Sequence, residues 1–193
     1  TPDFTMTETE KTQTSFKVDV AVTDVDKVGA ITKVELIHGE DVTNVEDLTT
    51  REFAKLLSNN DYTVKVTYTY DLNDGVGNQT LVRELKVKTE AKATPDFTIT
   101  ETEKTQTSFK FDISVTDVDK VGAITKIELV HGEDVTNVEQ LETRELTGLL
   151  SNNDYTVKVT YTYDLNDGVG KQTLVKELTV KTKEKLEPTF TIN

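Results

Sequence analysis

Apolar and polar residues alternate with a period of two along much of the chain. Every second position of residues 15–22 is apolar, and residues 62–70 follow the same rule with tyrosine, valine and threonine. β-Branched and aromatic residues at this period are typical of strands with one buried face. Further strands are expected at residues 3–9, 31–38 and 80–88, so the pattern predicts an all-β protein.

The same pattern occurs twice. Residues 1–5 recur as residues 94–98, and the offset of 93 continues without a gap, with 76 of 93 positions identical. The tail from Glu187 begins the pattern once more. Self-similarity at a fixed period is typical of repeat arrays. The sequence therefore predicts one module at 1–93, a second at 94–186 and the start of a third at 187–193.

One segment of the module is ambiguous. Leu48, Phe53 and Leu56 have a loosely helical spacing, but the matching stretch of the second copy contains Gly148. A glycine inside a helix costs about 1 kcal/mol relative to alanine. We therefore expect a strand near residues 51–57, with a short helix as the alternative.

Two substitutions between the copies bear on this strand. Val18 becomes Phe111, while Phe53 becomes Leu146. A gain in volume at one site and a loss at another is what a core of fixed volume tolerates best. We therefore expect residues 18 and 53 to lie on neighbouring strands and to touch.

Residues 146–159 resemble the E-to-F region of fibronectin type III domains. Leu149 lies six residues before Tyr155, with alternating valines after it, and Leu56 and Tyr62 have the same spacing. The resemblance implies a tyrosine corner, in which the tyrosine hydroxyl bonds to backbone upstream. It also implies the fold, which is two tandem seven-stranded antiparallel Ig-like (fibronectin type III-like) β-sandwiches.

The module departs from that family at two places. The usual tryptophan of the B strand is absent, and Phe16 and Val18 stand there instead. Ser58 replaces the proline that usually follows the corner leucine by two residues. These departures affect the choice of subfamily and leave the sandwich expectation in place.

The chain carries a net charge of −13 and contains no cysteine. Nucleic-acid phosphates require a basic face, and no cluster of lysine or arginine provides one. No run approaches the ~20 apolar residues of a membrane span. We expect neither a nucleic-acid partner nor membrane insertion.

Each module has a single histidine, His38 or His131. With no cysteine, these residues cannot form a set of nucleophile, base and orienting group. One histidine per module is also too few for a histidine metal site. We therefore expect no enzyme activity and no cofactor, apart from a candidate calcium site.

Oxygen-bearing residues gather in the predicted B–C and F–G loops, which share one end of such a sandwich. Carboxylate and amide oxygens suit Ca²⁺, which takes 6–8 oxygen ligands. Turn formation is the alternative role, because Asn-Asp-Gly supplies the residues that a hairpin needs. The candidate ligands are Asp24, Asp26, Asp71, Asn73 and Asp74, and in the second copy Asp117, Asp119, Asp164, Asn166 and Asp167.

The same loops also carry apolar residues, which need a partner more than polar ones do. They indicate either a ligand-binding tip or a contact between consecutive modules. The linker at residues 90–94 is short and contains no glycine, unlike flexible linkers. We favour the interdomain contact, which would join Val118, Val121, Leu165 and Val169 to Leu57 and Asn60 of the preceding module.

Nearly identical, threonine-rich, acidic and cysteine-free copies are similar to the repeats of bacterial, especially Gram-positive, surface proteins. That resemblance implies an extracellular or cell-surface location and an adhesin-like protein. Our leading hypothesis is a non-catalytic structural repeat that forms a semi-rigid stalk, with neighbouring repeats as its partners. One alternative is a multivalent module that binds host glycan or protein through its loops or sheet faces. Another is an accessory spacer of an extracellular enzyme.

Overall fold

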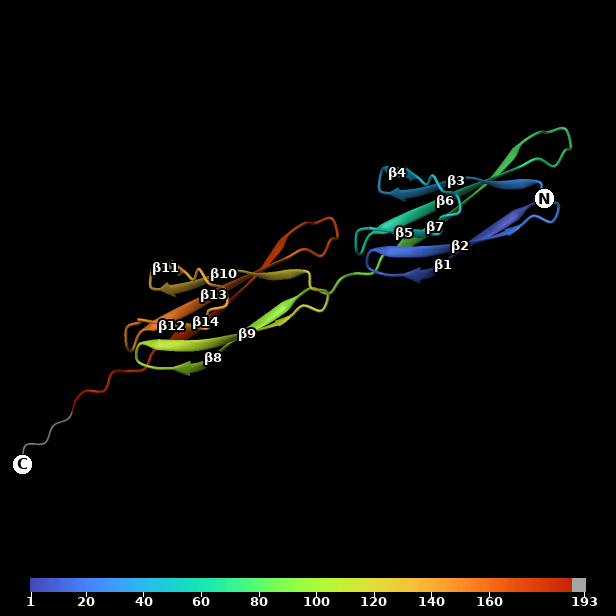
Figure 1. The fold of residues 1–193 in the computed structure, drawn as a ribbon. Coiled ribbons are helices and arrows are strands. Elements are labelled where there is room, and N and C mark those ends of the chain that lie inside the picture. The colour runs from blue at the N-terminus through green and yellow to red at the C-terminus, as the bar shows by residue number, and fades with distance from the viewer. Residues whose placement is uncertain (189–193) are drawn as a thin grey trace, which may run out of the picture. The chain divides into compact units, whose positions relative to one another are not determined.

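The computed structural model describes residues 1–188, and the chain passes from one compact unit to the next between Lys92 and Ala93 (Figure 1). The predicted start of a third copy, at 187–193, falls mostly on residues outside this range. The first unit contains β1 (Asp3–Lys11), β2 (Ser15–Thr23), β3 (Gly29–His38), β4 (Asp41–Asn44), β5 (Glu52–Ala54), β6 (Asp61–Tyr70) and β7 (Gln79–Lys88). The second contains β8 (Asp96–Lys104), β9 (Ser108–Thr116), β10 (Gly122–His131), β11 (Asp134–Asn137), β12 (Glu145–Thr147), β13 (Asp154–Tyr163) and β14 (Gln172–Lys181).

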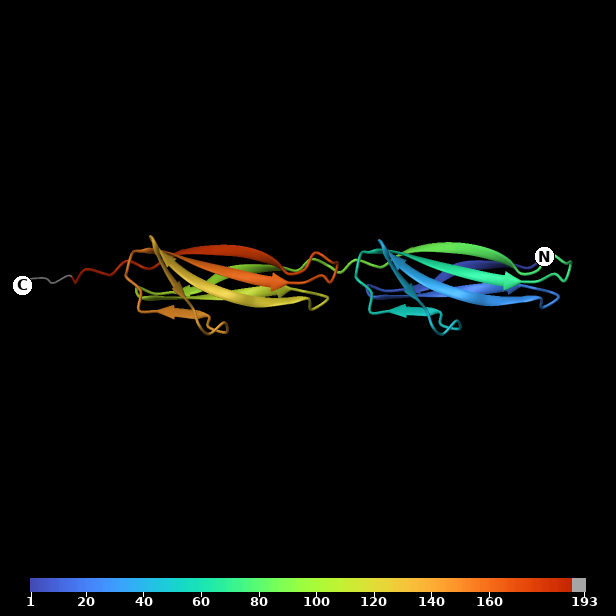
Figure 2. The same ribbon diagram turned by 90° about the horizontal axis from the view of Figure 1, so that it is seen from above.

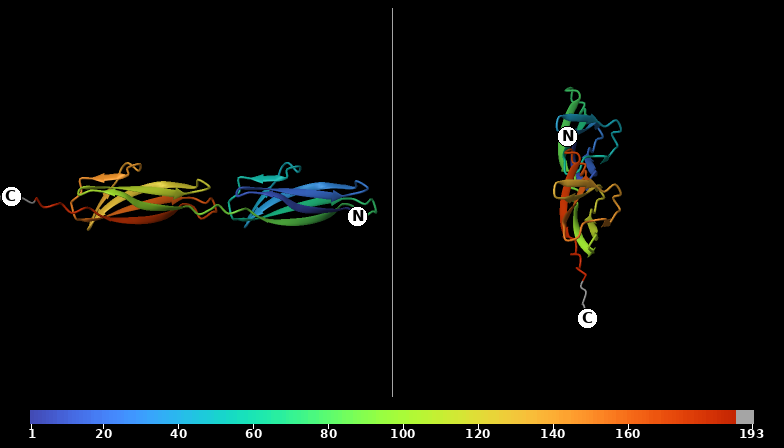
Figure 3. Two further views of the ribbon diagram at one scale, coloured as in Figure 1. Left: turned by 90° about the horizontal axis from the view of Figure 1, so that it is seen from below. Right: turned by 90° about the vertical axis from the view of Figure 1, so that its left-hand side faces the viewer.

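Each unit is a sandwich of two antiparallel sheets, as the two layers in Figures 2 and 3 show. The strand orders are β1-β2-β5 and β4-β3-β6-β7 in the first unit, and β8-β9-β12 and β11-β10-β13-β14 in the second. The prediction of two seven-stranded β-sandwiches is confirmed. No helix occurs within residues 1–188, and hence none that could span a membrane.

The strand β4 was not expected from the sequence pattern. It pairs with β3 through a two-residue hairpin, in which His38 lies opposite Asp41 and Gly39 has a φ of +59°. A glycine at the first central position is the signature of a type II′ turn, so a sequence signal existed. Because β4 joins β3, it departs from the constant-type immunoglobulin arrangement, in which the fourth strand lies beside the fifth.

The core follows the period-two pattern most closely in β6. Every second side chain of this strand points inward, and Val64 and Val66 are each 1% exposed. Tyr62, Tyr68 and Tyr70 occupy the remaining inward positions. From its place between β3 and β7, β6 reaches the opposite sheet, where the Tyr68 ring lies 6.2 Å from Phe4 and the Tyr62 ring 6.1 Å from Phe16.

The prediction that residues 18 and 53 lie on neighbouring strands is confirmed, but the two residues are not directly opposite each other. β2 pairs with β5, but the residue opposite Phe53 is Phe16, and their ring centroids are 5.1 Å apart. In the second unit, Leu146 lies opposite Phe109, whose ring is 6.3 Å from that of Phe111. The first unit thus has its second ring, Phe53, on β5, whereas the second unit has its second ring, Phe111, on β9, which corresponds to β2. In both units this ring lies beside the phenylalanine that the copies share, Phe16 or Phe109.

Within the ambiguous segment, residues 52–54 form the strand β5, and the helical alternative is wrong. β5 is only three residues long, shorter than the predicted 51–57. After Ala54, Lys55 takes a left-handed conformation with a φ of +60°, and Gly148 takes the same conformation in the second unit. A strand cannot continue through this conformation, which explains why β5 and β12 are short.

The two sheets approach each other along one side, where β1 faces β7. Arg83 of β7 forms an ion pair with Asp3 at 2.6 Å, and its guanidinium lies 5.7 Å from the centre of the Phe4 ring. In the second unit, Lys176 has the same two partners, Asp96 at 2.7 Å and the Phe97 ring at 5.6 Å. A cation on β7 or β14 therefore covers the phenylalanine that β1 or β8 contributes to the core.

The predicted tyrosine corner is present in both units. The Leu57 amide donates a hydrogen bond to the Tyr62 hydroxyl at 2.8 Å, and the Leu150 amide donates to Tyr155 at the same distance. The bond ties the loop after β5 to the start of β6, and it crosses from one sheet to the other. The phenol group thus helps to fix this loop to the core, together with the bond from the Leu56 amide to the Thr14 carbonyl at 2.9 Å.

We expect Tyr155→Phe to destabilise the second unit by about 1 kcal/mol, the usual net worth of one such hydrogen bond. For a unit of this size, this corresponds to a loss of roughly 4–8 °C in melting temperature. Calorimetry on the two-unit chain would measure it as a separate transition. Tyr163→Phe is the matched control, because its hydroxyl bonds only to the Gln172 side chain at 3.3 Å. Equal effects of the two substitutions would contradict the role given to the corner.

Candidate functional site

We define the N-terminal pole of a module as the end where β1 starts. Because Asp3 pairs with Thr23, this start lies beside the loop 24–28 between β2 and β3. The loop 71–78 between β6 and β7 belongs to the same end, since Tyr70 pairs with Gln79. In the second unit, the corresponding loops are 117–121 and 164–171. All ten candidate calcium ligands lie in these loops.

Asp24 organises the first of these loops. Its Oδ2 atom accepts hydrogen bonds from the Tyr68 hydroxyl at 2.6 Å and from the Gly29 amide at 3.0 Å. A side chain at Gly29 could not fit, because a Cβ atom there would lie 2.6 Å from the carbonyl oxygen of Thr69. The loop is therefore held against β6 by close backbone approach and by one carboxylate.

Asp117 has the same role in the second unit. Its Oδ2 atom accepts from the Tyr161 hydroxyl at 2.6 Å and from the Gly122 amide at 2.9 Å, while Oδ1 accepts from the Val121 amide at 3.0 Å. This carboxylate and its tyrosine are 44 residues apart in the chain. Sequence reasoning singled out the aspartate and missed its partner, because alternation alone assigns this tyrosine only to the core.

These bonds shift the pKa values of both partners. The hydrogen bond from Tyr68 is the main reason that the pKa of Asp24 lies below its usual 3.8. For Asp117, desolvation raises the pKa, but the bonds from Tyr161 and from backbone amides together outweigh it, and the net pKa is lowered. Burial, followed by the bond to the aspartate, raises the pKa of Tyr68 and of Tyr161 to about 12.

The second loop is built from turns that its own acidic residues close. The Asn73 amide donates to Asp71 Oδ1 at 2.8 Å, and the Val76 amide donates to Asp74 Oδ1 at 3.0 Å. Asn73 and Gly75 have positive φ angles of 56° and 85°, which asparagine and glycine tolerate. Carboxylates considered for calcium thus bond to backbone amides in this loop.

The predicted calcium ligands do not form a compact acidic cluster. Within residues 1–188, no group of three or more histidine, cysteine, aspartate or glutamate side chains is placed to hold a metal ion. In loop 24–28, the Asp24 carboxylate already accepts hydrogen bonds from the Tyr68 hydroxyl and the Gly29 amide. Calcium binding at this pole remains a prediction from sequence.

Apolar residues at this pole divide into two groups. Val25 and Val76 are 89% and 72% exposed at the loop tips, and Val118 and Val169 are similarly exposed in the second unit. Val28 and Leu72 are half-buried against the core of the first unit. Of the other residues predicted for an interdomain contact, Val121, Leu165, Leu57 and Asn60 are half-buried.

The opposite end, which we call the C-terminal pole, holds the outgoing chain. Thr89 is 2% exposed, and its hydroxyl donates to the Leu57 carbonyl at 2.6 Å and accepts from the Asn60 amide at 3.0 Å. The Glu90 amide donates to the Thr12 carbonyl at 3.0 Å. Thr182 repeats the threonine bonds in the second unit. No sequence signal singled out this threonine, because it follows the strand pattern that identified β7.

His38 belongs to the same pole and has a structural environment. Its ring stacks on Tyr62 with centroids 4.7 Å apart, and its Nε2 atom lies 3.0 Å from Asn60 Oδ1. The side-chain nitrogen Nδ2 of Asn60 in turn donates a hydrogen bond to the Ser58 carbonyl at 2.7 Å. These contacts support the loop that the tyrosine corner holds.

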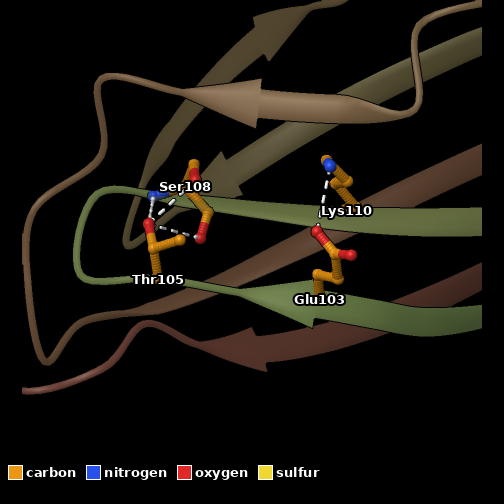
Figure 4. Close-up of polar contacts among 4 residues, drawn as sticks. All are labelled: Glu103, Thr105, Ser108 and Lys110. Carbon is orange, nitrogen blue, oxygen red and sulfur yellow. Dashed lines mark hydrogen bonds and ion pairs between the residues drawn. The ribbon is translucent and has the colours of Figure 1, made fainter.

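The hairpin between β8 and β9 completes this pole in the second unit (Figure 4). Thr105 Oγ1 accepts from the Ser108 amide at 3.0 Å, and the two hydroxyls are 2.8 Å apart. Lys110 forms an ion pair with Glu103 at 2.9 Å beside the β-bulge. A hollow of about 170 Å³ beside this hairpin is lined by these four residues together with Lys104, Phe109 and Glu145.

The aspartate–tyrosine pair predicts a two-sided dependence of stability on pH. A lowered aspartate pKa adds stability above about pH 3.8, which is lost as the pH falls. A raised tyrosine pKa adds stability below pH 10, which is lost as the pH rises toward 12. We expect Tyr68→Phe with Tyr161→Phe to lower the melting temperature most between pH 4 and 10, and progressively less outside that window. Thermal unfolding at a series of pH values would measure this, and a difference independent of pH would contradict it.

The calcium prediction has its own test. Ligand binding to the folded state alone raises the melting temperature with ligand concentration. If the pole binds calcium, the melting temperature should rise with added Ca²⁺, fall with a chelator, and lose this response in Asp71→Asn with Asp74→Asn. Mg²⁺ at equal concentration is the control for ionic strength. An unchanged melting temperature would end the calcium hypothesis.

No family model and no curated protein matches the sequence significantly. Several solved structures are similar to it. A two-domain fibronectin type III segment of chicken tenascin is 14% identical, and the match covers 91% of this chain and 98% of that one, with a TM-score of 0.32. The fibronectin(III)-like modules of CbhA from Clostridium thermocellum are 14% identical, covering 98% and 100%, with a TM-score of 0.31.

Chitinase ChiA74 from Bacillus thuringiensis is 20% identical, and the match covers 93% of this chain but only 26% of the chitinase, with a TM-score of 0.31. Because all three scores are below 0.5, the assignment of the fold rests on the strand order and register described above. Two of these three structures, the tenascin segment and the bacterial CbhA modules, are described as fibronectin type III or fibronectin(III)-like.

Proposed function

We propose that the chain is a non-catalytic spacer, made of repeats that form a semi-rigid stalk in a secreted or cell-surface, adhesin-like protein. One observation carries this proposal. Within each module, the chain begins at the N-terminal pole and leaves at the C-terminal pole, because Asp3 pairs with Thr23 while Lys88 pairs with Asp61 (Figure 1). A module of this kind lengthens a chain by its own long axis.

The strands set that length. β6 and β7 each contain ten residues, which at about 3.4 Å per residue span roughly 34 Å. Seven strands side by side in two sheets therefore fold the 93 residues of a module into a segment about as long as one strand. Repetition of such modules increases reach in proportion to their number.

The module holds the outgoing chain as far as Glu90, through Thr89 and the backbone bond to Thr12. The next module's first strand starts at Asp96. Only residues 91–95 lie between, including Pro95, whose ring fixes φ. A linker this short supports a semi-rigid stalk over freely jointed beads.

Aromatic side chains, which often anchor ligands, are already used in the two cores. Every tyrosine and phenylalanine within residues 1–188 is buried or half-buried. Ligand pockets are usually lined by apolar and aromatic side chains, and the rings of this chain pack on one another instead. This supports a spacer over a glycan-binding module.

The proposal includes the contact predicted between consecutive modules. Exposed valines at the N-terminal pole are loop residues that a neighbouring module would cover. Partners of the chain would then be its own neighbouring repeats. The acidic, cysteine-free composition supports the extracellular or surface location, where a self-repelling surface keeps repeated modules soluble.

Small-angle X-ray scattering on chains of two, four and six modules tests the stalk. We expect the maximum dimension to grow by a constant step of at least about 30 Å per module. Growth with the square root of the number of modules would indicate freely jointed beads and contradict the proposal.

Serine substitutions in the six-module chain test the contact. Replacing Val118, Leu165 and Val169 and their counterparts in each copy should shorten the maximum dimension. The matched control is Val175→Ser in each copy, because Val175 is 44% exposed on the face of β14 and away from both poles. Equal effects of the two sets would refute the predicted contact.

A further inference from the structure

The second module holds the residue that precedes it. The backbone amide of Ala93 donates a hydrogen bond to Asp119 Oδ2 at 2.6 Å, a short distance for an amide and a carboxylate. Ala93 belongs to the same compact unit as Asp119. The B–C loop thus binds a piece of backbone that lies outside the strands of the module.

The loop presents this carboxylate through a fixed turn. The Lys120 amide donates to the Asp117 carbonyl at 3.3 Å, and Lys120 has a φ of +51°. Asp117 is itself tied to Tyr161 and Gly122, so the turn that carries Asp119 is anchored to the core strand. The two aspartates have different tasks: the first supports the loop and the second reaches the incoming chain.

The first module has the same turn. The Lys27 amide donates to the Asp24 carbonyl at 3.3 Å, and Lys27 has a φ of +52°. Asp26, which corresponds to Asp119, has no hydrogen-bond or ion-pair partner in the described part of the chain. A hollow of about 110 Å³ lies beside it, lined by Thr1, Pro2, Thr23, Asp24, Val25, Asp26, Val28 and Leu72.

We propose that Asp26 and this hollow form a binding site for the backbone of a preceding copy's linker segment, the segment that residues 90–93 form before Thr94. The inference rests on the proposed function, since a preceding repeat supplies the occupant. The recognised group is the amide of the residue just before Thr1, which stands where Ala93 stands before Thr94. We call this the leading-segment site.

The chemistry of the site fits a backbone segment. A carboxylate accepts an amide hydrogen without reading a side chain, so it can hold any non-proline residue at this position. The residue at this position is Ala93 in the first copy and Leu186 in the second, and a site that binds only the backbone amide accepts both. Glu90 is hydrogen-bonded to the first module and Ala93 to the second, so only Ala91 and Lys92 lie between the two bonded residues.

Amide hydrogen exchange by NMR tests the site in a chain that carries Glu-Ala-Lys-Ala before Thr1. We expect the amide of the added final alanine to exchange at least about tenfold more slowly than in an unstructured peptide, as a bond to a charged acceptor implies. Asp26→Ala should abolish this protection, and Asp26→Asn, which keeps an acceptor oxygen, should restore part of it. An added alanine without protection, or with protection that survives Asp26→Ala, would overturn the proposal.

Ala93 and Asp119 provide the control within the same molecule. Asp119→Ala should remove protection from the Ala93 amide and leave the added alanine unchanged, and Asp26→Ala should do the reverse. Protection at Ala93 without protection at the added alanine would refute the leading-segment site of the first module and leave the spacer proposal untouched. Scattering that shows freely jointed modules would instead refute the spacer while this exchange pattern persisted.

Discussion

The central strand β6 connects the core of each module to both of its poles through two phenol groups. Tyr62, at its start, accepts the Leu57 amide, and Tyr68, near its end, donates to Asp24. Both rings are buried, so each hydroxyl must find a partner, and the available partners are the loops. The positions of the B–C and E–F loops are therefore set by the same alternation that builds the core.

The loops that these two phenol groups hold do not differ between the copies. Residues 22–33 and 56–77 are identical in the second copy, so the 17 differences lie elsewhere, mainly in β2, β3, β5 and β7 and the segments flanking them. Inside the core, the differences compensate, as when a phenylalanine moves from β5 to β2. A module can therefore vary its interior packing while loops 24–28 and 56–60 keep the same sequence.

The sequence predicted those features that depend on residues close together along the chain. Alternation in β6 predicted the buried face, and the spacing of Leu56 and Tyr62 predicted the corner. It was uninformative where the partner is distant, as for Asp24 and Tyr68, since no local pattern connects residues 44 apart. β4 was missed because its four residues are all exposed, which leaves no hydrophobic alternation to detect. The role of Thr89 was hidden for a different reason, since a buried threonine after a strand looks like one more strand residue.

The register of β7 has a mechanical consequence. Its ten residues pair with β6 without a bulge, from Gln79 opposite Tyr70 to Lys88 opposite Asp61. Tension between the two ends of a module would pull β7 along its own axis, so that its ladder of hydrogen bonds would be loaded in shear and all at once. β1 would carry the load at the other end of the module. Its pairing with β2 shifts between Glu8 and Glu10, so its hydrogen bonds form two shorter ladders. Under tension, a module of this design is therefore expected to yield first at the bulged strand, with the unbroken ladder of β7 the last to separate.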